Sequence, residues 1–107
     1  MAKMSEKLPH KLARQDAQVR VRGFLSGLKG RFAGKISDLE ENWDVFPHTF
    51  KFKVEVPKIS TKIEISGTLQ VLEREVQLEA EIPWLAKKFY GDQIIEAIQA
   101  EGRKLLA

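Results

Sequence analysis

Residues 48–84 read HTFKFKVEVPKISTKIEISGTLQVLEREVQLEAEIPW, and this stretch decides the fold. Apolar residues occupy every second position through most of it, and Lys, Glu, Gln, Ser or Thr stand between them. A two-residue period with one polar face indicates an antiparallel sheet that is covered on one side only. Breaks at Pro57-Lys58 and at Glu73-Arg74 divide the pattern, which predicts strands over 48–56, 59–72 and 75–82.

Two other segments can cover the apolar side of this sheet. Residues 14–33 place apolar side chains within about 100° of arc at the helical period, and residues 93–106 carry a second apolar face. Gly34 is a stop signal for the first helix, and Asp92 is expected to cap the last one. A short helical turn from Pro83 to Phe89 should precede that last helix.

The remaining segments complete the sheet. Residues 1–11 are expected to form a short edge strand, with a disordered tail as the alternative, and residues 35–43 are expected to form another strand. The chain of 107 residues is then a single domain, 1–107, of the α+β class. Its predicted architecture has two layers: an antiparallel sheet of four to five strands with the N-terminal and C-terminal helices packed on one face.

Composition and charge narrow the classes of function. The sequence has no cysteine, and no stretch approaches the ~20 apolar residues of a membrane span, so we expect a cytoplasmic protein without a transmembrane segment. Residues 1–35 hold nine basic residues against two acids, and residues 36–83 hold five against ten. This asymmetry either attracts an anionic partner or lets the basic helix complement the acidic sheet. The second interpretation is favoured, because nucleic-acid-binding domains usually carry more net charge than +3.

The sequence shows no catalytic, metal-binding or nucleotide-binding pattern. His10 and His48 have no carboxylate or second histidine at ligand spacing, and we expect them to be structural or exposed. Glu75, Glu79 and Glu81 follow one side of a strand, where neighbours two apart are separated by ~7 Å. We expect this row to be a solvated face and not a metal site. The expected cross-strand partners are Lys51, Lys53, Lys58 and Lys62. The predictions are no enzyme, no metal and no cofactor.

Two surfaces are candidates for contact with a partner. Three glycines in the first predicted helix lie opposite its apolar stripe, and each costs ~1 kcal/mol relative to alanine. Such a smooth face either packs against a second copy in a homodimer or is a solvated side of a weak helix. The aromatic corner after Pro83 is the other candidate. The candidate interaction residues are Arg20, Gly23, Gly27, Gly30, Arg31, Trp84 and Tyr90.

A ligand site between the helices and the sheet is a further hypothesis. Gly67 falls on the apolar face of the longest predicted strand, where the missing side chain leaves room for a hydrophobic small molecule. The candidate cavity-lining residues are Phe24, Leu28, Phe52, Ile65, Gly67, Leu69 and Ile98.

Short motifs along nearly the whole chain resemble a known family. These are His10-Lys-Leu12, Trp43, Gly67-Thr-Leu69-Gln-Val71, and the corner Ile82-Pro83-Trp84-Leu85 that leads through Phe89 into the last helix. Together they resemble the small bacterial polyhydroxyalkanoic acid system proteins, named for genes near polyhydroxyalkanoate granule loci. The chain departs from the family pattern in having Ile-Pro for Leu-Pro and in its helix glycines.

The resemblance implies a compact protein associated with storage-polymer granules, and it supplies no catalytic residues. The leading hypothesis is therefore a non-enzymatic interaction or accessory protein whose partner is a granule surface or another protein. The alternatives are a carrier for a hydrophobic small molecule and weak nucleic-acid binding through the basic N-terminal region.

Overall fold

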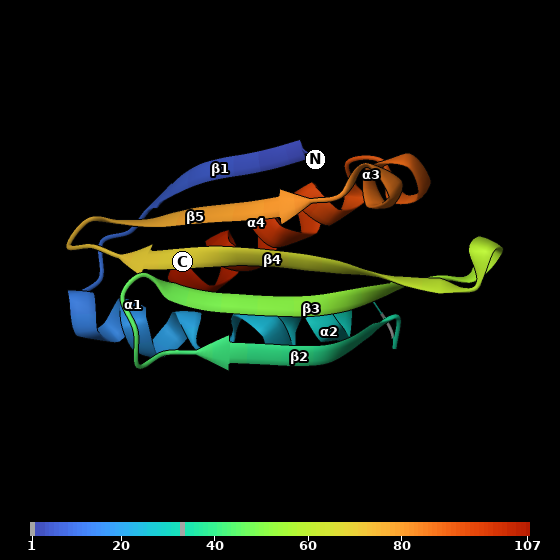
Figure 1. The fold of residues 1–107 in the computed structure, drawn as a ribbon. Helices are drawn as coiled ribbons and strands as arrows, with labels where there is room; N and C mark the ends of the chain where they lie inside the picture. The colour runs from blue at the N-terminus through green and yellow to red at the C-terminus, as the bar shows by residue number, and fades with distance from the viewer. Residues whose placement is uncertain (1, 33) are drawn as a thin grey trace.

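The alternating stretch forms the centre of a five-stranded antiparallel sheet in the computed structural model, which describes residues 2–32 and 34–107 (Figure 1). The sheet order is β1-β5-β4-β3-β2. The strands are β1 (Ala2–Pro9), β2 (Ile36–Asn42), β3 (His48–Val56), β4 (Thr61–Val71) and β5 (Glu75–Ile82). The helices are α1 (Arg14–Val21), α2 (Phe24–Arg31), α3 (Trp84–Tyr90) and α4 (Gln93–Leu106), and a 3₁₀ turn, η1 (Pro57–Ile59), joins β3 to β4.

The register of the sheet follows the alternation. β3 and β4 pair from His48 opposite Leu69 to Val56 opposite Thr61, so the apolar residues of both strands share one face. β1 is an edge strand that pairs with β5 along its whole length, which confirms the edge strand predicted within residues 1–11 and excludes the disordered tail there. The strands predicted over 48–56 and 75–82 and the helix predicted over 93–106 are confirmed.

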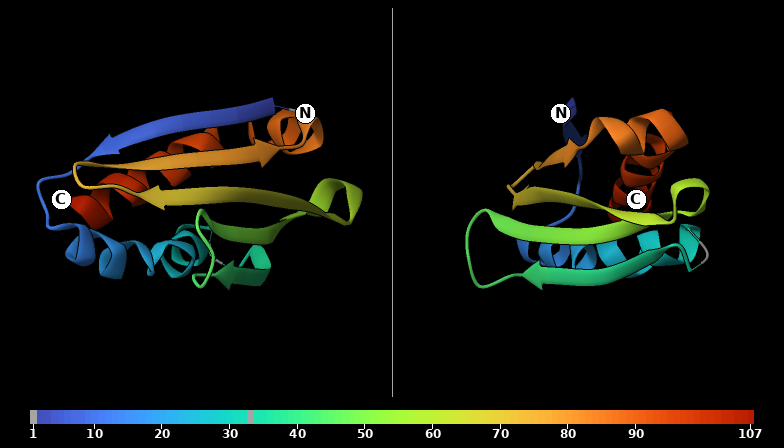
Figure 2. Two further views of the ribbon diagram at one scale, coloured as in Figure 1. Left: turned by 60° about the vertical axis from the view of Figure 1, so that its left-hand side comes forward. Right: turned by 45° about the vertical axis from the view of Figure 1, so that its right-hand side comes forward.

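The helices cover the apolar face of the sheet, as the two views in Figure 2 show. The single helix predicted over 14–33 is wrong, because the chain forms α1 and α2 with a break at Arg22-Gly23. Gly23 leaves the helical conformation, with ψ near 4°, and stands at the N-cap of α2. Glycine favours the helix less than other residues, so the break costs little there, and both halves contact α4. The predicted end at residue 33 lies outside the described residues.

The structure corrects two further predictions. β4 begins at Thr61 and not at residue 59, because Pro57 fixes its own φ and lacks an N–H, and η1 forms in place of the strand. Ile59 therefore leaves the sheet and is 42% exposed. Asp92 does precede α4, but its side chain makes no capping hydrogen bond; its backbone carbonyl accepts the Glu96 N–H at 2.8 Å.

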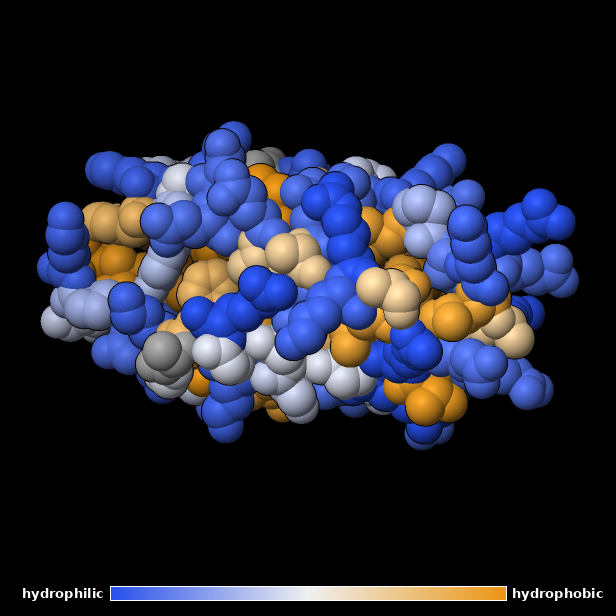
Figure 3. Space-filling view, turned by 180° about the vertical axis from the view of Figure 1, so that it is seen from behind, coloured by the Kyte–Doolittle hydropathy of each residue, from blue (hydrophilic) through white to orange (hydrophobic). Residues whose placement is uncertain are grey.

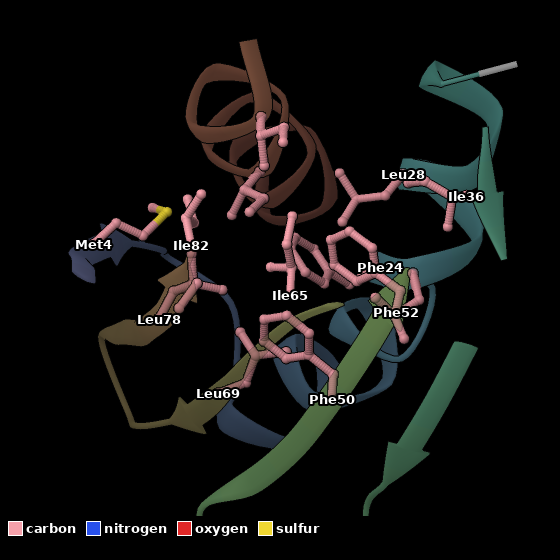
Figure 4. Packing of buried hydrophobic residues seen from close by; sticks show 14 of the residues in the cluster. Met4, Phe24, Leu28, Ile36, Phe50, Phe52, Ile65, Leu69, Leu78 and Ile82 are labelled. Carbon is pink, nitrogen blue, oxygen red and sulfur yellow. The ribbon is translucent and has the colours of Figure 1, made fainter. Parts of the chain in front are cut away.

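One hydrophobic core lies between the sheet and the helices (Figure 4). The rings of Phe24 from α2 and Phe50 from β3 meet edge to face with their centroids 5.4 Å apart. Phe50 stands opposite Gly67 in the β3–β4 register, and its ring occupies the space in which a Gly67 side chain would lie. The backbone carbonyl of Glu79 in β5 lies in the same space, and the close approach of these two groups explains why glycine is required in the middle of the longest strand.

The outer face of the sheet is polar, and several ion pairs connect its strands. Lys51 lies 3.0 Å from Glu40 and 3.9 Å from Glu64, and Lys53 lies 3.5 Å from Asp38. These lysines were predicted to balance the acidic row of β5, but their partners come from β2 and β4. Glu79 of that row pairs instead with Lys3 of β1 at 3.8 Å, because β1 and not β3 is its neighbour on that side. Exposed pairs of this kind contribute ~0–1 kcal/mol each.

Candidate functional site

α3 is a short helix with one buried and one exposed side. Pro83 precedes it in the extended conformation, and Gly91 ends it with φ of +59°. Ala86 is buried and Leu85 and Phe89 are partly buried, so they fix this helix to the body of the protein. Trp84, Lys87 and Lys88 share the opposite side, since residues three and four apart are neighbours on a helix surface, and all three are exposed.

Trp84 is the most exposed aromatic side chain of the described residues, at 62%. The Nζ atom of Lys88 lies 5.9 Å from the ring centroids of both Trp84 and Phe89. Cation–π attraction at an exposed site contributes ~0.5–1 kcal/mol and keeps the ammonium group beside the indole. The exposed side of α3 therefore combines a large apolar ring with two cations.

Tyr90 holds α3 against the end of β3. Its hydroxyl donates a hydrogen bond to the backbone carbonyl of Glu55, and its ring packs edge to face on Phe32 with a centroid distance of 6.2 Å. Burial raises the pKa of the Tyr90 hydroxyl above its ordinary value, and the charge of Glu55 raises it further. Tyr90, a predicted interaction residue, thus makes contacts within the fold.

The η1 turn lies at the same end of the molecule as α3 in every ribbon view (Figures 1 and 2). Lys58 and Ile59 are exposed at its tip. The set Lys58, Ile59, Trp84, Lys87 and Lys88 is called the α3–η1 end below. Two apolar side chains and three lysines, from two segments distant in sequence, thus lie at one end of a molecule 44 Å long. No helix of the described residues is long and apolar enough to cross a membrane.

The glycine-rich side of α2 packs against α4 of the same chain. Glu101 of α4 lies over Gly27, so that a Cβ atom at position 27 would overlap its carboxylate, and Leu105 lies near Gly23. Of the three predicted glycines, Gly30 alone has open space, with no neighbouring atom within 4 Å of where a side chain would begin. Figure 3 shows the molecule from the side on which the helices lie; pale and tan residues gather in the middle of this surface, and hydrophilic side chains lie across them.

The basic side chains of the N-terminal helices also make internal contacts. Arg31 Nε donates to Glu101 Oε1 at 2.8 Å, and Arg20 Nη1 donates to the Ala107 carbonyl at 2.6 Å. Arg14 Nε donates to the Val71 carbonyl at 3.1 Å, and the Arg22 guanidinium lies 5.9 Å from the Trp43 ring centroid. These four arginines therefore make contacts within the fold of the protein.

The predicted cavity-lining residues belong to the packed core. Phe24, Leu28, Phe52, Ile65, Leu69 and Ile98 are all buried in one cluster. Phe50 fills the room over Gly67 that the carrier hypothesis requires. A hollow of about 960 Å³ lies instead over the outer face of the sheet, lined by residues of all five strands. Lys3, Lys51, Glu79 and Glu81 line it together, and this mixture of charges selects no class of ligand.

Three polar residues are buried: for His10 and His48 this agrees with the structural role expected as one alternative, whereas the burial of Glu101 was not predicted. Glu101 is 2% exposed, and an acid at that helical position gives no local sign of burial. His10 is buried: its Nδ1 accepts the Leu12 N–H at 3.2 Å, so its Nε2 donates to the Leu72 carbonyl at 2.9 Å. His48 is buried beside Trp43 and Phe46, with ring centroids 5.0 and 5.9 Å away. The described residues include no group of three His, Asp or Glu placed to hold a metal ion.

Comparison with known proteins gives one family match. The model of the family described as "Putative polyhydroxyalkanoic acid system protein" matches residues 7–106. No curated protein matches the chain.

Several solved structures are similar to the chain at low identity. The di-domain ARO/CYC StfQ from the steffimycin biosynthetic pathway is 10% identical with a TM-score of 0.44; the match covers 97% of this chain, which spans 48% of that chain. Ara h 8.0201 is 9% identical with a TM-score of 0.46, over 98% of this chain and 97% of its own. TTHA0849 from Thermus thermophilus is 13% identical with a TM-score of 0.37, over 98% and 90%.

Proposed function

Because the chain belongs to the family of polyhydroxyalkanoic acid system proteins, we propose that it is a non-enzymatic accessory protein that attaches to the surface of storage-polymer granules. The family match covers residues 7–106 and therefore includes every helix of the fold. The family name supports a role in the polymer system, and the α3–η1 end supports a role in surface attachment.

The observation that carries this proposal is the exposure of Trp84 on a rigid support. Trp84 as a whole residue remains 62% exposed, so most of its surface stays in contact with water and does not contribute to the core. Pro83, Ala86 and the Tyr90–Glu55 hydrogen bond fix the helix that carries it. A fixed, exposed aromatic residue binds a partner surface with a small loss of conformational entropy.

The chemistry of the polymer suits this contact. A polyhydroxyalkanoate is a polyester, so its surface offers aliphatic chains together with ester carbonyl groups. Trp84 presents a large apolar ring together with one N–H donor. Tryptophan is enriched at interfaces where one end of the side chain meets an apolar phase and the other end meets water. Ile59 adds a second exposed apolar group at the same end.

Sedimentation with polymer granules tests the proposal. The purified protein is mixed with amorphous polyhydroxyalkanoate granules, and its distribution between pellet and supernatant is measured. We expect the wild-type protein in the pellet and a large loss of binding in Trp84→Ala. Val19→Ala is the matched control, because Val19 is 70% exposed on α1 and lies outside the α3–η1 end. Wild-type protein that stays wholly in the supernatant contradicts the proposal.

A further inference from the structure

We propose that the α3–η1 end docks on an anionic phospholipid surface. The inference rests on the proposed function, because it concerns the same end of the molecule and names anionic phospholipid as the surface that this end contacts. It is carried by the arrangement of lysines around two exposed apolar side chains.

The charge at this end is predominantly positive. The basic residues here are Lys3, Lys35, Lys58, Lys62, Lys87 and Lys88, and the acidic residues are Glu55, Glu81 and Asp92, with Glu96 one turn further into α4. Glu55 stands opposite Lys62 in the β3–β4 register, so these two charges offset each other. Among the described residues, Lys58, Lys87 and Lys88 form none of the ion pairs. Their charges remain available to an external anion.

The apolar groups stand among these charges. Trp84 shares one side of α3 with Lys87 and Lys88, and Ile59 follows Lys58 directly at the hairpin tip. Tryptophan is enriched at the boundary between water and lipid, where its ring sits at the level of the headgroups. Lysines beside it gain attraction to anionic headgroups of ~1 kcal/mol each, which is about a fivefold change in affinity per residue.

The exposed basic residues Lys11, Arg74 and Lys104 at the opposite end of the molecule are matched in number by the exposed acids Asp16, Asp44 and Glu73. Val19, Val45 and Phe46 are exposed apolar residues outside the α3–η1 end. Two arginines at this end are engaged within the protein, however: Arg20 of α1 with the Ala107 carbonyl, and Arg22, which follows α1, with the Trp43 ring. Phe46 also packs on the buried His48. Binding through the α3–η1 end would therefore orient the long axis of the molecule upright on the lipid surface. In this orientation α1 lies at the far end and does not contact the lipid.

Vesicle binding tests the inference. The protein is mixed with vesicles of phosphatidylcholine alone and with vesicles that also contain phosphatidylglycerol, and in parallel with lipid-free polyester particles. A Trp43→Phe background leaves Trp84 as the single tryptophan, so its emission reports contact directly. We expect a blue shift with the anionic vesicles only, and a loss of binding as salt is raised, since salt screens charge attraction at exposed sites.

Charge reversal supplies the matched variants. Lys87→Glu with Lys88→Glu should weaken binding to anionic vesicles at least ~25-fold, the product of two fivefold losses. The control pair Lys11→Glu with Lys104→Glu changes the net charge equally outside the α3–η1 end and should leave binding nearly unchanged. All four side chains are exposed, so both proteins should fold, which circular dichroism verifies.

The outcomes separate this inference from the proposed function. Binding to lipid-free polyester without binding to anionic vesicles overturns the lipid inference and leaves granule attachment intact. Binding to neither surface overturns both. Equal binding to neutral and anionic vesicles, or equal losses in the two charge-reversal pairs, overturns the role of the three lysines.

Discussion

The carboxylate of Glu101 in α4 lies directly over Gly27 in α2, in the space that a side chain at position 27 would occupy. The same carboxylate accepts the Arg31 Nε–H at 2.8 Å, one helical turn beyond that glycine. The glycine therefore permits the close approach of two helices, and an acid from one helix pairs with an arginine of the other.

Substitution of the α2 glycines by alanine should have opposite effects at two positions. Gly27→Ala should lower the free energy of unfolding by ~1–3 kcal/mol, because the new methyl group displaces Glu101. Gly30→Ala meets nothing within 4 Å and should raise it by up to ~1 kcal/mol through helix propensity. Urea denaturation measures both changes. Stabilisation by both variants would show that α4 does not pack on α2 in this way.

Removal of one partner of the Arg31–Glu101 pair should cost more than removal of both. Arg31→Met leaves the buried carboxylate of Glu101 without its cation, and we expect the free energy of unfolding to fall by ~1–3 kcal/mol. The double variant Arg31→Met, Glu101→Gln should recover part of that loss, because no unpaired charge remains. A double-mutant cycle from denaturation curves gives the coupling free energy. Strictly additive losses would contradict the pairing.

Tyr90 should ionise above the ordinary pKa of tyrosine. It is the single tyrosine of the chain, so the ultraviolet absorbance of tyrosinate reports its titration alone. Burial is the larger cause of its raised pKa, so Glu55→Gln should lower the midpoint only in part. Because the unfolded chain ionises first, the stability that Tyr90 contributes is present below its unfolded pKa and is lost as the pH rises through the folded pKa. A midpoint at or below the ordinary value would contradict this environment.

His10 should stabilise the junction between β1 and α1. Its ring bridges the Leu12 N–H and the Leu72 carbonyl, which lies in the β4–β5 connection. His10→Ala should lower the free energy of unfolding by ~1–2 kcal/mol and speed the hydrogen exchange of the Leu12 amide. Lys11→Ala, at the exposed neighbouring position, should change stability by less than ~0.5 kcal/mol. Equal effects of the two substitutions would mean that the ring is not the bridging group.

The local pattern of apolar residues predicts most elements of this fold, because strands repeat every two residues and helices repeat about every 3.6 residues. The strands over 48–56 and 75–82 and the helix over 93–106 follow from alternation and from the helical period. The one predicted helix of residues 14–33 failed at Gly23, since the apolar stripe continues through the break and gives no sign of it. The start of β4 failed because Ile59 keeps the alternation although Pro57 has already turned the chain.

The candidate site was predictable only in part. The exposed Trp84 follows a proline corner that is visible in the sequence, whereas its neighbours Lys58 and Ile59 come from a turn 25 residues earlier. Sheet pairing brings these segments to one end, and no local pattern specifies which hairpin tip lies beside which helix. The packing partner of the glycines could not be predicted either, because a smooth helix face can pack equally well against a second copy of the protein and against another helix of the same chain.

The sequence by itself determined the class of the fold, the strands at its centre and the membership of one polymer-system family. These depend on periodicity and short motifs, which are local. Only the tertiary structure decided that Glu101 is buried against Gly27 and that the alternating stretch from His48 to Trp84 ends in a cationic, aromatic surface. Burial and charge clustering depend on contacts between residues far apart in the chain, and those contacts exist only once the helices have packed on the sheet.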